Sequence, residues 1–208
     1  MAPGRKPGAH RTCETRFPLH FSLRMPLAFT RIPSPVGELT LVASDTALTA
    51  VYFATSRHVP PLHLVERGPG GEDGAEDVAG WLEDDGSGPA GIVLARTRDQ
   101  LNEYFARART TFDLPLDPAG STFERRVWDA LRAIPYGSTV SYGELARRLG
   151  DPRATRAVGA ANGKNPIPII VPCHRVVGAR GELTGFGGGL DRKRWLLEHE
   201  GAALALGH

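Results

Sequence analysis

Three side chains with reactive groups follow one another at Cys173, His174 and Arg175, within the apolar run 166–177. β-branched residues bounded by prolines predict a buried strand, which would present a thiol, an imidazole and a guanidinium where regular pairing ends. A thiol attacks as its thiolate, so a nucleophilic cysteine needs a nearby base or a positive field, and His174 and Arg175 are candidates for both. The alternative is a buried structural thiol, because neighbouring residues of a strand point to opposite faces.

Motifs on both sides of this segment favour the reactive interpretation. They are Asn-Pro-Ile-Pro at 165–168, Pro-Cys-His-Arg-Val at 172–176, Thr-Gly-Phe-Gly-Gly-Gly at 184–189 and Trp-Leu-Leu-Glu-His-Glu-Gly at 195–201. In this order they closely resemble the O6-alkylguanine-DNA alkyltransferases, and the resemblance runs without a gap over 123–201. It implies a DNA repair protein that moves the alkyl group from O6 of guanine, and from O4 of thymine, irreversibly to its own cysteine. Each molecule would therefore act once, with no cofactor.

The resemblance implies a role for each residue of the reactive centre. Cys173 matches the nucleophile, and His174 matches the histidine that accepts its proton, in that family through a bound water. Glu200 matches the carboxylate that orients this histidine, which parallels the logic of catalytic triads. Asn165 matches the asparagine that ties down the segment before the cysteine, and Tyr142 matches the tyrosine that donates a proton to the departing base. From local sequence alone, Glu200 could instead end a solvated helix, and Asn165 could only form a turn before proline.

The same resemblance implies how DNA is bound. The reacting oxygen lies inside the base stack, so the nucleotide must rotate out of the duplex into a pocket. Arg156 matches the arginine that fills the resulting gap. The residues implied in DNA binding are Arg156, Tyr142, Gly143, Ala154 and Gly159, and those implied in the pocket are Pro168, Val176, Phe186 and Gly188. Phe186 stands where many relatives have tyrosine, and Gly187 where some have serine, which leaves the preference among lesions open.

Helices must position these groups in the C-terminal half. Ser121 with Glu124, and Ser141 with Glu144, have the spacing of a capping box and predict two helix starts. The first helix should bury one face, made of Phe123, Val127, Ala130, Leu131 and Ile134. The second should span 142–149, and a third should begin near Pro152, end at 162–163 and bury Ala154, Ala157, Val158 and Ala161. Together the last two predict a helix-turn-helix, although a plain helical hairpin fits the local sequence too. A recognition helix usually enters the major groove, but a smooth outer side could also lie in the minor groove, and the resemblance favours the minor groove.

The N-terminal half has a different pattern. Alternating residues predict strands at 27–32, 37–43 and 47–53 in a small antiparallel meander. The Gly/Pro-rich, acidic segment 55–91 predicts a long mobile loop. Leu101, Tyr104, Phe105 and Ala108 have helical spacing and should cover the meander, and 111–117 could add a strand.

The expected fold is thus an α/β N-terminal domain, with a small antiparallel sheet plus helix, followed by a mostly helical C-terminal domain with a winged-helix-like helix-turn-helix. The expected boundaries are a disordered extension at 1–24, an N-terminal domain of limited function at 25–117, a DNA-binding and catalytic domain at 121–202 and a tail at 203–208. The N-terminal extension contains His10, Cys13 and His20, which are a weak pattern for a structural metal site, so we expect no metal.

Composition sets further limits. The 208 residues carry a net charge of only +2, but 121–195 holds thirteen Lys and Arg against six Asp and Glu, which suits the DNA backbone. The chain has two cysteines, Cys13 and Cys173, and neither a long apolar run nor a secretory signal, which favours a cytoplasmic location. We also expect a monomer.

Two other functions fit parts of the sequence. An alkyltransferase-like protein would bind the lesion without removing it, but that class lacks the acceptor cysteine that Cys173 supplies. A transcription regulator would read sequence through the helix-turn-helix, but the third helix offers few side chains for base contacts.

Overall fold

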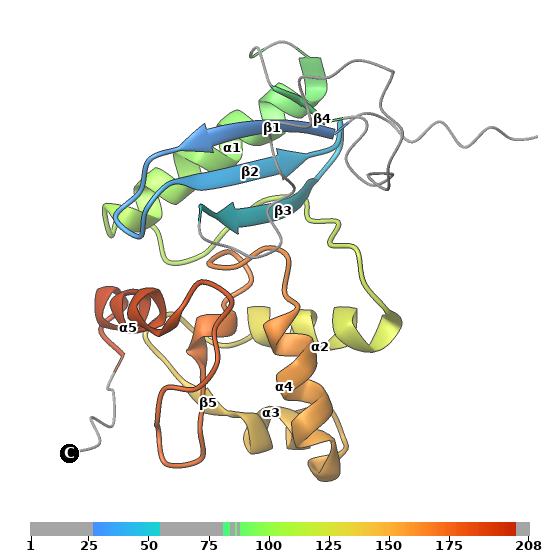
Figure 1. Ribbon diagram of the computed structural model, residues 1–208, viewed down its shortest axis with the longest axis vertical. Helices are drawn as coiled ribbons and strands as arrows, with labels where there is room; N and C mark the ends of the chain where they lie inside the picture. Colours follow the sequence, from blue (N-terminus) through green and yellow to red (C-terminus); the bar gives the residue numbers. More distant parts are fainter. Residues whose placement is uncertain (1–26, 55–80, 84–85, 87, 203–208) are drawn as a thin grey trace, which may run out of the picture.

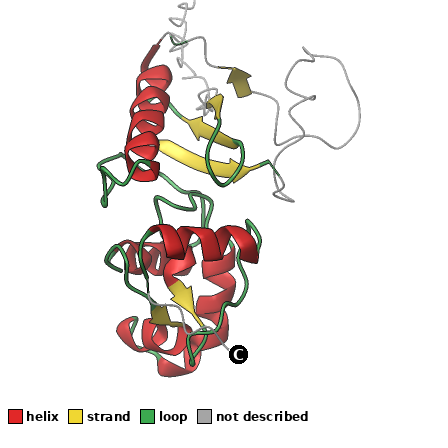
Figure 2. Ribbon diagram, turned by 90° about the vertical axis from the view of Figure 1, so that its left-hand side faces the viewer, coloured by secondary structure: helices red, strands yellow, loops and turns green. Residues whose placement is uncertain are grey.

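A computed structural model of the chain describes residues 27–54, 81–83, 86 and 88–202. Its N-terminal region is a sheet with the order β3-β2-β1-β4. Strands β1 (Leu27–Ile32), β2 (Leu39–Ala43) and β3 (Leu48–Phe53) form the predicted antiparallel meander. Helix α1 (Gly88–Phe105) packs against one face of this sheet (Figure 2). The small sheet with its helix confirms the fold expected for this half.

The segment 55–91 contains more structure than predicted. Strand β4 (Trp81–Glu83) pairs in parallel with β1, and α1 already begins at Gly88, while 55–80 lies outside the described residues. Helix α1 ends earlier than its pattern suggested, because the chain leaves the helix at Arg107, which has a φ of 59°. Ala108 is therefore exposed and takes no part in the core. The strand expected at 111–117 is reduced to one bridge between Leu48 and Leu116.

The C-terminal region is mainly helical, as predicted. It consists of α2 (Thr122–Arg132), β5 (Val140–Ser141), α3 (Tyr142–Arg148), the 3-10 helix η2 (Pro152–Ala154), α4 (Thr155–Gly163), the 3-10 helix η3 (Cys173–Arg175), β6 (Val176–Val177) and α5 (Leu190–His199). Strands β5 and β6 pair in parallel. The helix pair α3 and α4, joined through η2, is the predicted helix-turn-helix.

The predicted helix caps are present, with one difference. Ser121 and Glu124 form the complete capping box of α2. At α3, Ser141 accepts a hydrogen bond from the backbone of Glu144, but the Glu144 carboxylate pairs with Arg147 and Arg148 instead. Two cations one turn further along the helix compete for that carboxylate, and the second half of the box does not form.

The inward faces of the helices follow the sequence pattern only in part. Val127, Leu131 and Ile134 of the first face are buried, whereas Phe123 is 37% exposed. On α4, Val158 and Ala161 are buried and Ala157 is exposed, while Ala154 of the preceding η2 is half-buried. The indole of Trp128 donates to the carbonyl of Ala161 at 2.9 Å and joins α2 to α4.

The strand predicted at 166–177 was wrong for most of its length. Residues 167–178 are buried, but 166–172 run through turns, Cys173 starts a 3-10 helix, and only Val176 and Val177 are in a strand. Ile169 has a φ of 74°, which extended chain does not allow. Three prolines in this segment have no N–H to donate, so a regular ladder cannot form. The apolar run therefore reflects burial, and strand pairing is limited to its last two residues, Val176 and Val177.

The two regions share one hydrophobic core. Leu48, Val51 and Phe53 of the sheet belong to the same cluster as Ile167, Ile169 and Cys173 of the turn segment. The backbone N–H of Val51 donates to the carbonyl of Pro166 at 2.8 Å. In Figure 1 the sheet and α1 lie above the helical region, and the turn segment reaches up to β3. Among the described residues, no helix has the length and apolar character to cross a membrane.

Candidate active site

Cys173 opens η3 and lies in the wall of a cavity of about 730 Å³. Its side chain is nearly buried, with 5% exposed. Burial raises the pKa of the thiol to about 11, although a hydrogen bond from Asn165 and the charge of Lys193 act in the opposite direction. At neutral pH the group is thus a thiol, and it needs a base before it can attack.

Asn165 holds the turn segment that leads to the cysteine. Its Nδ2 donates to the carbonyl of Val171 at 2.7 Å, and its Oδ1 accepts from the backbone of Ile167 at 3.0 Å. One side chain thereby closes both ends of the turn. Asn165 therefore both forms the turn before Pro166 and ties down the segment before Cys173, the two roles that the sequence suggested.

His174 and Glu200 lie together although 26 residues separate them. His174 Nε2 is 2.9 Å from Glu200 Oε1, and both side chains are fully buried. An ionised carboxylate only accepts hydrogen bonds, so Nε2 carries the proton and Nδ1 has a free lone pair. Nδ1 is buried without a hydrogen-bond partner among the described residues. Burial lowers the pKa of His174, which keeps the ring neutral and able to accept a proton at Nδ1.

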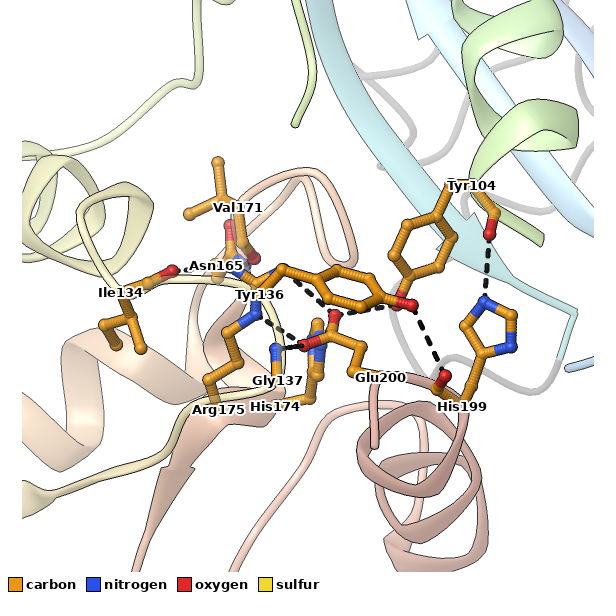
Figure 3. A network of polar contacts seen from close by, with 10 residues as sticks. All are labelled: Tyr104, Ile134, Tyr136, Gly137, Asn165, Val171, His174, Arg175, His199 and Glu200. Atoms are coloured by element: carbon orange, nitrogen blue, oxygen red, sulfur yellow. Dashed lines mark hydrogen bonds and ion pairs between the residues drawn. The ribbon is translucent and has the colours of Figure 1, made fainter. Parts of the chain in front are cut away.

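Glu200 is the centre of a buried polar network (Figure 3). Its Oε1 accepts from His174 Nε2, from Arg175 Nη2 at 2.9 Å and from the Tyr104 hydroxyl at 2.8 Å. Its Oε2 accepts from Arg175 Nε at 2.8 Å and from the backbone of Gly137 at 3.2 Å. Burial alone would raise the pKa of Glu200, but the hydrogen bonds from His174 and Arg175 bring it to about 2. The carboxylate is therefore a permanent anion.

Arg175 does not supply the base or the field that its position next to the cysteine suggested. It is buried, pairs with Glu200 in bidentate fashion and donates through Nη1 to the carbonyl of Ile134 at 2.6 Å. Its guanidinium also lies over the ring of Tyr136, 5.8 Å from the centroid. The role of Arg175 is to compensate the charge of Glu200.

The nearby positive charge comes from Lys193, which the sequence did not single out. This lysine is fully buried on α5, and its Nζ donates to the carbonyls of Val176 and Thr184, each at 2.6 Å. Burial lowers its pKa to about 8. In the sequence it is one of four adjacent charged residues at 191–194, and that pattern is more typical of a solvated surface.

The cavity beside Cys173 is built from both regions of the chain. Pro168, Phe186 and Gly188 line it, as expected. Val176 is not among the lining residues, because β6 pairs it with Val140 and buries it fully in the core. Several lining residues were not predicted from the sequence, and three of them, Val51, Tyr52 and Phe53, come from β3 of the N-terminal region.

Gly188 is essential to the shape of this cavity. A Cβ at this position would lie 2.7 Å from the ring of Phe53 and 2.8 Å from the ring of Phe186. These two rings meet edge to face, with centroids 5.8 Å apart. The volume and the flat apolar walls suit an aromatic base.

The residues implied in DNA binding lie on the helix-turn-helix. Arg156 is exposed on α4 and has no ion pair with any described residue. Tyr142 starts α3 and packs next to Gly159, where an added Cβ would lie 3.7 Å from the tyrosine ring. Gly143 follows Tyr142 and is half-buried, as is Ala154 of η2. None of these five residues is among those that line the cavity beside Cys173.

The metal pattern in the N-terminal extension falls at His10, Cys13 and His20, outside the described residues. Within the described ranges, no cluster of three or more His, Cys, Asp or Glu side chains could hold a metal ion.

Comparisons with known proteins cover nearly all of the described chain. Residues 122–202 match the family described as 6-O-methylguanine DNA methyltransferase, DNA binding domain, and residues 27–118 match its ribonuclease-like domain. A methylated-DNA–protein-cysteine methyltransferase of Mycolicibacterium paratuberculosis is 46% identical over 184 residues, covering 86% of this chain and 98% of that protein. One of Shigella flexneri is 50% identical over 178 residues, covering 84% and 95%. The crystal structure of Mycobacterium tuberculosis OGT in complex with DNA is similar with a TM-score of 0.69 and 45% identity, over 84% of this chain and 92% of that one.

Proposed function

The chain belongs to the 6-O-methylguanine DNA methyltransferase family, and we propose that Cys173 is the acceptor of the alkyl group. The protein repairs DNA by transferring an alkyl group from O6-alkylguanine in the DNA to a cysteine of its own chain. A non-catalytic lesion-binding protein is not favoured, because the relatives are transferases and a cysteine stands at the reactive position.

The observation that carries the proposal is the position of Cys173 between a base-sized cavity and a buried acid-base network. The thiol lines the cavity of about 730 Å³, and the next residue, His174, is bonded to the ionised Glu200. In the proposed site, these three residues would supply the nucleophile, the base and the orienting carboxylate by which weak nucleophiles are activated.

In the proposed reaction, the neutral His174 accepts the thiol proton, and Glu200 stabilises the imidazolium that results. The thiolate sulfur attacks the alkyl carbon in line with the bond to O6. An S–C bond forms as the C–O bond breaks, and its electron pair leaves on O6. Tyr142 supplies a proton to the departing base. The thioether cannot be hydrolysed under these conditions, so each molecule acts once and no cofactor takes part.

We propose that the lesion reaches this thiol by leaving the duplex. Arg156 would enter the gap in the base stack from α4, while Gly143, Ala154 and Gly159 would let the backbone of the helix pair approach the groove. The extruded base would lie against Pro168, Phe186 and Gly188. Rotating a base out of the stack costs a few kcal/mol, and the cost is smallest for a base that pairs badly. Alkylated bases, including O4-alkylthymine, should therefore be extruded more readily than normal ones.

The proposed chemistry also bears on the cellular compartment and the oligomeric state of the protein. A thiol that must stay reduced until it meets a lesion suits the cytoplasm, where disulfides are rare. A monomer is sufficient, because all proposed catalytic groups come from one chain.

The test is transfer of a labelled methyl group from a duplex that carries one O6-methylguanine. Cys173→Ser should abolish transfer and leave duplex binding unchanged. Cys13→Ser removes the other cysteine and serves as the matched control, with unchanged transfer. Transfer that survives in Cys173→Ser and is lost in Cys13→Ser would overturn the assignment.

A further inference from the structure

We infer that Tyr104, a residue of the N-terminal region, is a positioning residue for the reaction, acting through Glu200 on the base His174. This inference rests on the proposed function. It assigns the N-terminal region a part in the chemistry, whereas the sequence suggested limited function for it.

The geometry of Tyr104 is specific for this role. The residue lies near the end of α1, is fully buried, and donates its hydroxyl to Glu200 Oε1 at 2.8 Å. The two residues are 96 positions apart, so the contact joins the two regions of the chain. The raised pKa of Tyr104, caused by burial and by the charge of Glu200, keeps the phenol protonated as a donor. In Figure 3 the ring extends from α1 directly to the carboxylate.

Three further contacts hold His199 and the backbone of Tyr104 in place. His199, next to Glu200, is bonded through Nε2 to the backbone carbonyl of Tyr104 at 2.9 Å. The imidazole of His199 stacks on Trp195, with centroids 4.8 Å apart. The hydroxyl of Tyr136 donates to the carbonyl of His199 at 3.3 Å. Adjacent residues at the end of α5 therefore hold the main chain and the side chain of the same tyrosine.

The Tyr104 hydroxyl should affect the reaction because it donates to the same carboxylate oxygen of Glu200 as the imidazole of His174, the proposed base. Oε1 accepts from both Tyr104 and His174, and each donor takes part of the negative charge of that oxygen. A donor on Oε1 weakens the stabilisation of the imidazolium and keeps His174 neutral at rest. The other titratable groups that face His174 are Arg175 and Lys193, and those that face Tyr104 are Glu200, Arg175, Tyr136 and His199. None of these groups is altered when only the hydroxyl is removed.

The test is the single-turnover rate of methyl transfer at saturating duplex, measured from mildly acidic to mildly alkaline pH in Tyr104→Phe. The rate falls where the base becomes protonated. Loss of the hydroxyl should move this midpoint upward by about one pH unit and reduce the rate on the order of tenfold at pH values below the wild-type midpoint, with a smaller loss at neutral pH. The alkaline plateau and the Kd for the duplex should stay close to those of the wild type.

Thr97→Val is the matched control. Thr97 lies about two turns earlier on the same buried face of α1, and its hydroxyl donates only to the carbonyl of Val93. Both variants remove one buried hydroxyl, so thermal unfolding can match their stability losses. An unchanged midpoint in Tyr104→Phe, or the same upward shift in Thr97→Val, would overturn the inference. Absence of transfer by the wild type would instead contradict the proposed function.

Discussion

The helix pair proposed to bind DNA and the network around Glu200 differ in how their charges are paired. On α4, Arg156 is exposed and has no ion pair with a described residue. Around Glu200, every charge is buried and has a partner inside the chain, as in the bidentate pair with Arg175. An unpaired exposed cation is available to a phosphate or a base stack, whereas a satisfied buried charge can only act on its neighbours.

This difference separates recognition from chemistry. Changes on the helix pair should affect reactions that need a duplex, because only there does the base have to be extruded. Changes in the network should affect any alkyl donor that reaches Cys173, including a free O6-benzylguanine base. The ratio of the two rates therefore measures which region a residue belongs to.

Glu200→Gln should have the largest effect. It leaves Arg175 buried without its counter-charge, which should cost about 3–5 kcal/mol of folding free energy. It also removes the anion that stabilises the imidazolium, so transfer from duplex and from free base should both fall by about 100-fold or more. Urea unfolding and both transfer rates check this.

The matched control is Glu198→Gln, two residues earlier on α5 and exposed. It removes the same charge outside the network and should leave stability and both rates unchanged. If Glu200→Gln reduced transfer from the duplex but not from the free base, the proposed difference between the two regions would be contradicted.

The second-largest effect should come from lowering the pH, which destabilises the folded protein through Glu200 and His174. The pKa of Glu200 is about 2 in the folded protein against an ordinary value of 4.5, so its contribution is complete above the ordinary value and is lost as the pH falls toward 2. The pKa of His174 is below its ordinary 6.5, so the unfolded chain binds a proton first and stability already declines below that pH.

Glu200 and His174 both make the folded protein less stable as the pH falls. Each additional proton that the unfolded chain binds lowers the free energy of unfolding by about 1.4 kcal/mol per pH unit. Urea midpoints measured from neutral pH downward should therefore decrease from about the ordinary pKa of histidine. His174→Gln should remove the upper part of this dependence. Identical slopes in the two proteins would show that His174 is not buried in its neutral form.

Arg156→Ala should have the smallest and most selective effect. Without a side chain to fill the gap in the stack, the transfer rate from saturating duplex should fall on the order of tenfold, while reaction with the free base is unchanged. Arg153→Ala, another exposed arginine of the helix pair, should weaken duplex binding and its salt dependence without changing the saturated rate. Equal losses of Arg156→Ala on duplex and free base would contradict the role in extrusion.

Local signals in the sequence were sufficient for much of this arrangement. The cap at Ser121, the meander and the helix-turn-helix follow from spacing within short windows, and the structure confirms them. The strand predicted at 166–177 was wrong except at Val176 and Val177, because an apolar run indicates burial and three prolines prevent the pairing that a strand needs.

The remaining features depend on contacts between distant residues. Tyr104 has an ordinary amphipathic position in α1, and nothing near it in the sequence indicates a partner 96 residues away. Lys193 stands among charged residues typical of a surface, yet α5 turns it inward to two carbonyls. The cavity wall formed by β3 likewise appears only when the two regions are packed together.

The most direct test of the central claim is intact-protein mass spectrometry after incubation with a duplex that carries one O6-methylguanine, followed by peptide mapping. The account predicts one methyl increment per protein, saturating at that value and located on Cys173. An unmodified protein that still binds the lesion, or a methyl group on another residue, would contradict it.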